Sequence, residues 1–268
     1  MPGIVLTGRE ASGIRSGFFG KLPARRDFVT GNLSRAVTER WHDWLEDGLV
    51  RSRELIGEGW LDAYLNLPVW QFALSGGLCG EGALAGVMVP NLDKVGRHFP
   101  LVIAVVLPAE AAPAVVAAAL APWYAVAEAL ALSSLEAGFV FEEFERQVDA
   151  LVATLPETGP AVEAAGEAPW PVVPGQPCGW QWSAGAHGDP ALVFACAVDG
   201  AMAEAFGRHS LWWSSGSDLL RPALVAHPGL PGASAFTALL DGQWEERGWQ
   251  AAPEFAPAGA GCGPDGYL

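Results

Sequence analysis

The 268-residue sequence has little lysine, cysteine and histidine, and each scarcity excludes a kind of chemistry. Lys21 and Lys94 are the only lysines, against thirteen arginines. No two of the four cysteines lie closer than eighteen residues, so no C-x-x-C metal or redox pair exists. The five histidines are scattered without metal-ligand spacing. We therefore expect no metal, no cofactor and a reducing compartment.

Long apolar segments are also missing. The N-terminal region offers only residues 4–6 as an apolar run, which predicts no signal peptide. The longest apolar run begins at Phe99 and is interrupted by Pro108 and Glu110, well before it could span a bilayer. The sequence therefore predicts no membrane insertion and a cytoplasmic location.

Positive charge is scarce in the second part of the chain. Residues 1–100 hold eleven basic and eleven acidic side chains, whereas residues 101–268 hold four basic and nineteen acidic ones. The net charge of −15 therefore comes from the later part, and it disfavours nucleic acid and anionic membranes as partners. An apolar content of 51% with 17% charged residues excludes global disorder.

Apolar periodicity and turn residues predict an order of helices and strands. Strands are expected at 16–21, 69–75, 83–89, 99–107, 209–213 and 221–226, and helices at 33–56, 59–66, 110–137 (broken or bent at Pro122), 141–155, 190–206 and 232–240. The strand at 99–107 is apolar on both faces, which favours a central position. The segment 156–177 contains six prolines and three glycines and predicts a long surface loop.

These elements predict an α+β fold, with helices layered on a mixed, mostly antiparallel sheet. The last two strands make a poor sheet by themselves, so we expect them to join the first sheet. The expected organisation is an N-terminal extension (1–15), one domain (16–250) containing the proline-rich loop, and a flexible tail (251–268).

Searches for catalytic motifs give only near misses. Residues 17–22 contain Gly-Lys, but the loop is too short for a phosphate loop and no Ser or Thr follows. Residues 80–86 miss the dinucleotide spacing by one residue and precede a predicted strand. Glu142 and Glu143 lie on an acidic helix surface, where a solvated face is the better interpretation. No catalytic residue is therefore assigned.

Two loops, 20–28 and 90–101, combine arginine or lysine, one aspartate and turn residues beside a strand. Arg–Asp pairs can hold loops together or bind an anionic group of a partner. Structural anchoring is the favoured interpretation, partner contact the main alternative, and catalysis the least supported. If strands 16–21 and 99–107 are neighbours, the loops meet. Asp93 and Arg97 would then be structural, and the candidate partner-binding residues are Lys21, Arg25, Arg26 and Asp27.

Several ordered motifs over residues 16–245 resemble the TagF family of type VI secretion accessory proteins. They are 17–25 with Asp27-Phe28, Trp70 to Gly76, Gly86-Val87 with Pro90, Asp93 to Leu101, Ser210 to Trp213 with Gly216-Ser217, and Gly229 to Pro231 with Phe236. The sequence departs from the family at Arg26, where glycine is usual, and at Asn91, where serine is usual. It also carries no phosphatase domain, which some relatives have.

The resemblance implies a layered α/β fold of the longin or profilin type, and a function. Such proteins are non-enzymatic cytoplasmic repressors that act after translation by protein–protein binding, in some members with a forkhead-associated scaffold. Two alternatives stay open. One is a structural or assembly subunit of the secretion machine, and the other is an enzyme that uses Arg25, Asp27, Asp93 and Arg97. The structural motif residues are expected to be Gly20, Pro23, Asp93, Gly96, Arg97, Pro100, Trp212 and Trp213.

Overall fold

A computed structural model describes residues 14–156 and 190–250. The expected N-terminal extension, proline-rich loop and tail fall almost entirely outside these residues. The strands are β1 (Ser16–Gly20), β2 (Val29–Gly31), β3 (Trp70–Leu74), β4 (Ala83–Val89), β5 (Leu101–Leu107), β6 (His209–Ser214) and β7 (Ala223–Pro228). The α-helices are α1 (Arg35–Ile56), α2 (Trp60–Leu65), α3 (Pro113–Ala119), α4 (Ala121–Ser133), α5 (Phe141–Ala150), α6 (Pro190–Phe206) and α7 (Ala233–Asp241), with short 3₁₀ turns η1 (Gly57–Gly59), η2 (Leu151–Thr154) and η3 (Glu245–Arg247).

The strands form one open sheet in the order β2-β1-β5-β4-β3-β6-β7. Every described pair is antiparallel, so the expected parallel component is not present among these strands. Strands β3, β4 and β5 form the predicted meander. The late strands join it as expected, because β6 pairs with β3. This arrangement makes the chain an α+β protein with one continuous sheet.

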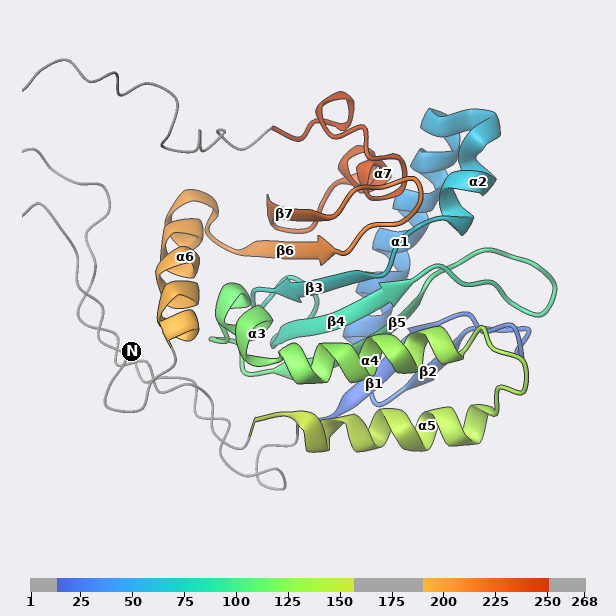
Figure 1. Ribbon diagram of the computed structural model, residues 1–268, viewed down its shortest axis with the longest axis horizontal. Coiled ribbons are helices and arrows are strands. Elements are labelled where there is room, and N and C mark those ends of the chain that lie inside the picture. Colours follow the sequence, from blue (N-terminus) through green and yellow to red (C-terminus); the bar gives the residue numbers. More distant parts are fainter. Residues whose placement is uncertain (1–13, 157–189, 251–268) are drawn as a thin grey trace, which may run out of the picture.

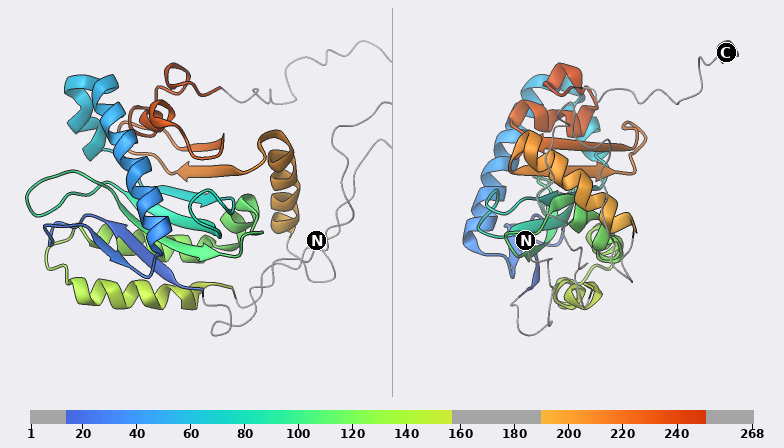
Figure 2. Two further views of the ribbon diagram at one scale, coloured as in Figure 1. Left: turned by 180° about the vertical axis from the view of Figure 1, so that it is seen from behind. Right: turned by 90° about the vertical axis from the view of Figure 1, so that its left-hand side faces the viewer.

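Helices cover both faces of the sheet and make three layers (Figures 1 and 2). Helix α1 crosses one face diagonally, with α2 and α7 beside it. Helices α3, α4 and α5 cover the other face over β1, β5 and β4. Helix α6 stands at one end of the sheet against α3 and β6.

Large aromatic side chains fill the α1 side of the sheet. Val37, Trp41, Trp44 and Leu45 recur at helical spacing, which gives α1 one apolar face. The indole of Trp44 lies 5.2 Å from that of Trp212. Such rings stabilise a core through the apolar area that they bury and through contacts between the rings. The strand β6 is therefore bound into this layer as well as into the sheet.

The helices on the opposite face of the sheet, α3 and α4, are built mainly from smaller side chains. Helices α3 and α4 contribute mainly alanine, valine and leucine, together with the buried Trp123 and Tyr124. No single helix in the described ranges is long and apolar enough to cross a bilayer. Helices α3 and α4 reach that length and apolarity only as a pair, and they are bent by 77° at their junction.

The expected elements match the observed ones closely. The break expected at Pro122 is confirmed, because the region 110–137 forms two helices and Pro122 occupies the first turn of α4. The central strand is β4, and β5 lies next to it, so the central position expected for 99–107 is wrong by one strand. Strand β7 begins two residues later than expected. The three-residue strand β2 is too short to show periodicity and was not expected.

Gly48 lies where α1 packs tightly against α7, and this packing gives a testable prediction. A Cβ atom at Gly48 would lie 2.5 Å from the buried Phe236 ring, whereas one at Gly200 in α6 would meet nothing within 4 Å. We expect Gly48→Ala to lower the free energy of unfolding by about 1–3 kcal/mol through overpacking. Gly200→Ala, the matched control, should raise it by about 0.5–1 kcal/mol. Urea unfolding of both variants measures this, and a stabilised Gly48→Ala would contradict the packing.

Candidate functional site

The two loops singled out above meet at one end of the sheet. Strands β1 and β5 are antiparallel neighbours, so the loop after β1 and the loop before β5 emerge side by side. The amide of Lys94 donates to the carbonyl oxygen of Arg25 over 2.8 Å. The guanidinium of Arg97 donates from Nη2 to the carbonyl oxygen of Arg26 over 2.7 Å. The expectation that the loops touch is therefore confirmed.

Asp93 is the centre of this contact. Its Oδ1 accepts the backbone amides of Val95 and Arg97, at 3.0 and 2.9 Å. Its Oδ2 accepts Nε of Arg97 at 2.6 Å and lies 3.2 Å from Nζ of Lys21. A carboxylate has about four lone-pair positions, so this one is fully used. The carboxylate thus joins the end of β1 to the loop before β5.

These donors set the charge state of Asp93. Burial by itself would raise the pKa of the carboxyl group, because it disfavours the charged form. The amide of Arg97, its guanidinium, the ammonium of Lys21 and the amide of Val95 outweigh burial and hold the pKa of Asp93 well below its usual range. Asp93 is therefore an anion in the folded chain at neutral pH.

A turn and two close backbone contacts shape the first loop. Arg25 N–H donates to the carbonyl oxygen of Leu22, which closes a turn with Pro23 at its second position. Gly20 has φ +144°, and a Cβ atom there would lie 2.2 Å from the carbonyl oxygen of Pro100. Only glycine fits this approach, which explains the motif glycine Gly20.

Asn91 connects the second loop to two helices. This residue is buried, and its backbone carbonyl accepts the hydroxyl of Tyr64 at 2.7 Å. Its side-chain amide donates to Oγ of Ser134 at 2.9 Å. The asparagine at this family-variable position therefore links α2, the loop and the end of α4. At the tip, Gly96 has φ +84°, which favours glycine.

The outer side of the paired loops is apolar and basic. We call it the loop surface and define it by Arg25, Arg26, Phe28, Lys94 and Val95, all exposed. Phe28 is 41% and Val95 58% exposed. The Phe28 ring is not loose, because it stacks on Phe19 at 5.5 Å. The surface thus presents apolar groups on a rigid base.

The four candidate partner-binding residues separate into two groups. Lys21 is buried against Asp93, and its ammonium lies 5.1 Å from the centre of the Phe28 ring. Lys21 is therefore not accessible to a partner, contrary to the expectation. Arg25, Arg26 and Asp27 are exposed. Arg25 lies 4.3 Å over Phe141 and reaches Glu142, which ties the loop surface to α5.

Arg97 and Asp93 take the anchoring position expected for them, although the Arg97 side chain keeps 60% of its area exposed. Arg26 is not among the residues with positive φ, so its backbone needs no glycine. Sequence reasoning did not foresee Tyr64, Ser134 or Phe141 at this site. Each reaches it from a distant element, and no local pattern marks such a contact.

The adjacent motif residues Trp212 and Trp213 lie on opposite faces of the sheet. Trp212 is fully buried against α1, and its Nε1 donates to Oγ of Ser210. Trp213 faces α4, donates from Nε1 to Oε1 of Gln71 at 2.6 Å, and lies 4.9 Å from Tyr124. Their role is to hold β6 between the two helical layers, far from the loops.

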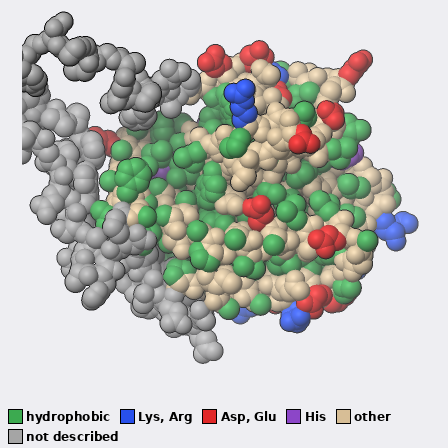
Figure 3. Space-filling view, viewed as in Figure 1, with side chains coloured by type: hydrophobic (Ala, Val, Ile, Leu, Met, Phe, Trp, Pro, Cys, Tyr) green, Lys and Arg blue, Asp and Glu red, His purple; other side chains and the backbone are tan. Residues whose placement is uncertain are grey.

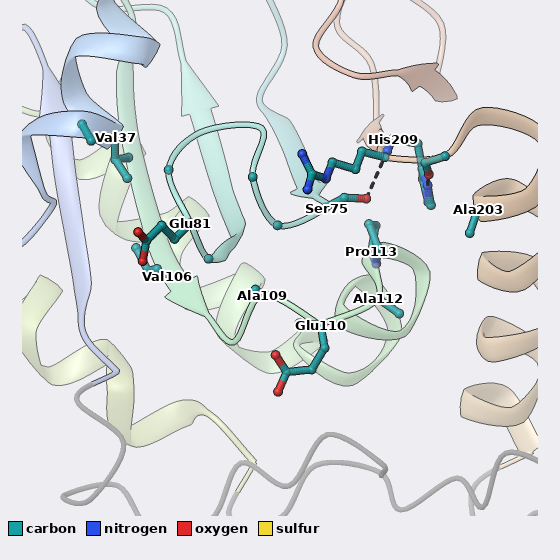
Figure 4. A pocket seen from close by; sticks show the side chains of 18 of the residues that line it. Val37, Ser75, Glu81, Val106, Ala109, Glu110, Ala112, Pro113, Ala203 and His209 are labelled. Atoms are coloured by element: carbon teal, nitrogen blue, oxygen red, sulfur yellow. Dashed lines mark hydrogen bonds between the residues drawn. The ribbon is translucent and has the colours of Figure 1, made fainter. Parts of the chain in front are cut away.

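Away from the loops, a hollow of about 1290 Å³ is lined in part by Ser75, Asp199 and His209. Figure 4 shows Ser75 and His209 in it. The arrangement does not match a hydrolase triad. Oγ of Ser75 accepts the backbone amide of His209 rather than facing its ring. The ring nitrogens face the carbonyl oxygen of Gly207 and the carboxylate of Asp199. The imidazole thus has no nitrogen directed at Ser75.

The comparisons with known proteins agree with this architecture. A model of the TagF N-terminal domain, described as type VI secretion system-associated, matches residues 17–151. The crystal structure of PA0076 from Pseudomonas aeruginosa PAO1 is 34% identical, with a TM-score of 0.67, and the match covers 90% of this chain and 98% of that one. No curated protein matches the chain.

The layered sheet and its paired loops thus define a type VI secretion system-associated protein. The chain belongs to the TagF family, through the N-terminal domain that contains both loops and Asp93.

Asp93→Ala should remove the anchor of both loops. We expect the free energy of unfolding near neutral pH to fall by about 3–5 kcal/mol, because the ammonium of Lys21 is left buried without its partner. Asp27→Ala removes an exposed carboxylate from the same loop and should change stability by less than about 0.5 kcal/mol. Equal effects of the two substitutions would contradict the anchoring role.

The stabilising effect of Asp93 should depend on pH. The folded pKa lies below the unfolded value of about 3.9, so the stabilisation is complete above that value and is lost as the pH falls through the folded pKa. The stability difference between the wild-type chain and Asp93→Asn should therefore shrink below about pH 4. Urea unfolding across this range measures it. A constant difference would show that another group dominates.

Proposed function

We propose that this protein is a non-enzymatic, cytoplasmic repressor of the type VI secretion system that acts after translation, by binding a protein partner through the loop surface. The family membership supports the secretion system, and the loop surface supports binding as the mode of action. The partner we propose is a forkhead-associated scaffold of that system.

One observation carries this proposal: a rigid base displays exposed apolar and basic side chains together. Phe28 and Val95 expose apolar area that a partner could bury. The hydrogen bonds around Asp93 fix the loops beforehand, so binding them costs little conformational entropy. Rigid exposed aromatic groups beside arginine are typical of binding hot spots.

The charge of the loop surface predicts the character of the contact. Arg25, Arg26 and Lys94 lie close together in a chain whose net charge is −15. They would steer an acidic partner surface towards the loops. Affinity for the scaffold should therefore fall as the ionic strength rises, and titrations at low and high salt measure this. Salt-independent affinity would exclude these cations from the interface.

The double variant Arg26→Glu, Val95→Asp tests the proposed function directly. Both side chains are exposed and neither anchors the loops, so the melting temperature should stay unchanged. Affinity for the purified scaffold should fall at least about tenfold, a loss of roughly 1.4 kcal/mol. In a strain without its own copy of the gene, effector secretion should no longer be repressed.

The matched control is Arg35→Glu, Val50→Asp, which makes the same changes on the exposed side of α1. It should leave both affinity and repression intact. The proposal fails if the loop variant represses as well as the wild-type chain. Co-sedimentation of the chain with assembled secretion sheath would instead favour an assembly subunit.

A further inference from the structure

The sheet has a second exposed region, on the side of α4 and at the opposite edge from β1. Directly paired residues on adjacent antiparallel strands share a face. Gln71 pairs with Trp213, and Trp213 pairs with Leu224, so these three side chains form a row across β3, β6 and β7. Leu224, at the end of the row, is 70% exposed. We call this row, with Glu128 and Leu132 of α4, the β6–β7 face.

A hollow separates this row from α4. It has a volume of about 440 Å³, and Gln71, Tyr124, Glu128, Leu132 and Trp213 line part of it. Leu132 adds a second exposed apolar side chain at its rim. Figure 3 shows hydrophobic side chains gathered over this part of the molecule, above α4. The β6–β7 face is thus concave, with exposed apolar side chains beside polar ones.

Hydrogen bonds fix the orientation of the polar side chains in the hollow. Gln71 accepts from Nε1 of Trp213 with Oε1 and donates from Nε2 to Oε2 of Glu128 at 2.7 Å. Within the described ranges, Oε1 of Glu128 takes part in no recorded hydrogen bond. A half-buried carboxylate with one oxygen free favours a cationic group beside it.

The charge in the hollow is negative. Among the described residues that line it, Glu128 is the charged one. Arg208 and Arg221 stand just before β6 and β7 in the chain and are not among the lining residues. A protein segment with basic side chains would be complementary to the hollow.

We propose that the β6–β7 face binds a protein segment that combines apolar side chains with lysine or arginine, the cation lying against Glu128. The apolar side chains cover Leu224, Trp213 and Leu132. This contact is independent of the loop surface and uses the opposite edge of the sheet, so the two proposals can fail separately.

Site-specific photo-crosslinking tests the contact. The photoreactive amino acid p-benzoylphenylalanine replaces Leu224 in the full chain, expressed in the bacterium that encodes it. The same amino acid at Val50, an exposed position on α1, is the matched control. Mass spectrometry maps the crosslinked peptides. We expect Leu224 adducts on another protein, within a segment that holds lysine or arginine among apolar residues, in excess over the control.

Charge variants sharpen the test. Glu128→Lys should lower the adduct yield several-fold, and Glu128→Gln should lower it less, because glutamine keeps an oxygen that Gln71 can reach. Thermal unfolding of each variant checks that it is folded, and a probe at Leu132 replaces the one at Leu224 if that position destabilises the chain. Crosslinks from Leu224 to another part of this chain, to a second copy of it, to an acidic protein segment or to lipid would overturn the proposal. A crosslink yield at Leu224 no higher than at Val50 would also overturn it.

Discussion

The buried carboxylate of Asp93 is the interaction on which the candidate site depends. Charges are rarely buried unless each lone pair has a donor, and here two amides, a guanidinium and an ammonium supply them. Because the donors come from both loops, neither loop can keep its shape if the other moves. The relative placement of the two loops, which carry the exposed Phe28 and Val95, follows from this arrangement.

The protein separates its charges as well as its layers. The loop surface carries the cations of Arg25, Arg26 and Lys94, whereas the β6–β7 face carries the carboxylate of Glu128 towards the other edge of the sheet. If both proposed contacts form, partners of opposite charge bind at separate places on the sheet and do not compete.

Local patterns in the sequence predict most of the fold. The helix over 33–56 follows from apolar spacing and from Gly57, and strands β3 to β5 follow from alternation and short connections. The pairing of the two loops also follows, once β1 and β5 are placed as neighbours. Lys21 could not be assigned correctly, because its burial depends on Asp93, 72 positions later in the chain, occupying the same space. Asn91 and Tyr64 meet for the same kind of reason, since tertiary contact leaves no periodic signal.

The attachment of β6 to β3 also has a consequence for the order of folding. Trp213 reaches Gln71 across 142 positions of the chain, and Trp212 covers the α1 tryptophans over a similar separation. Contacts this distant in sequence form slowly, because a long loop must close first. On the ribosome, the meander and α1 emerge well before β6, so Trp41 can pack on Phe72 while Trp44 still lacks its partners Trp212 and Phe236. Part of this aromatic layer therefore stays exposed to solvent until the last strands are synthesised, and exposed apolar surface of this kind favours aggregation of an incomplete chain.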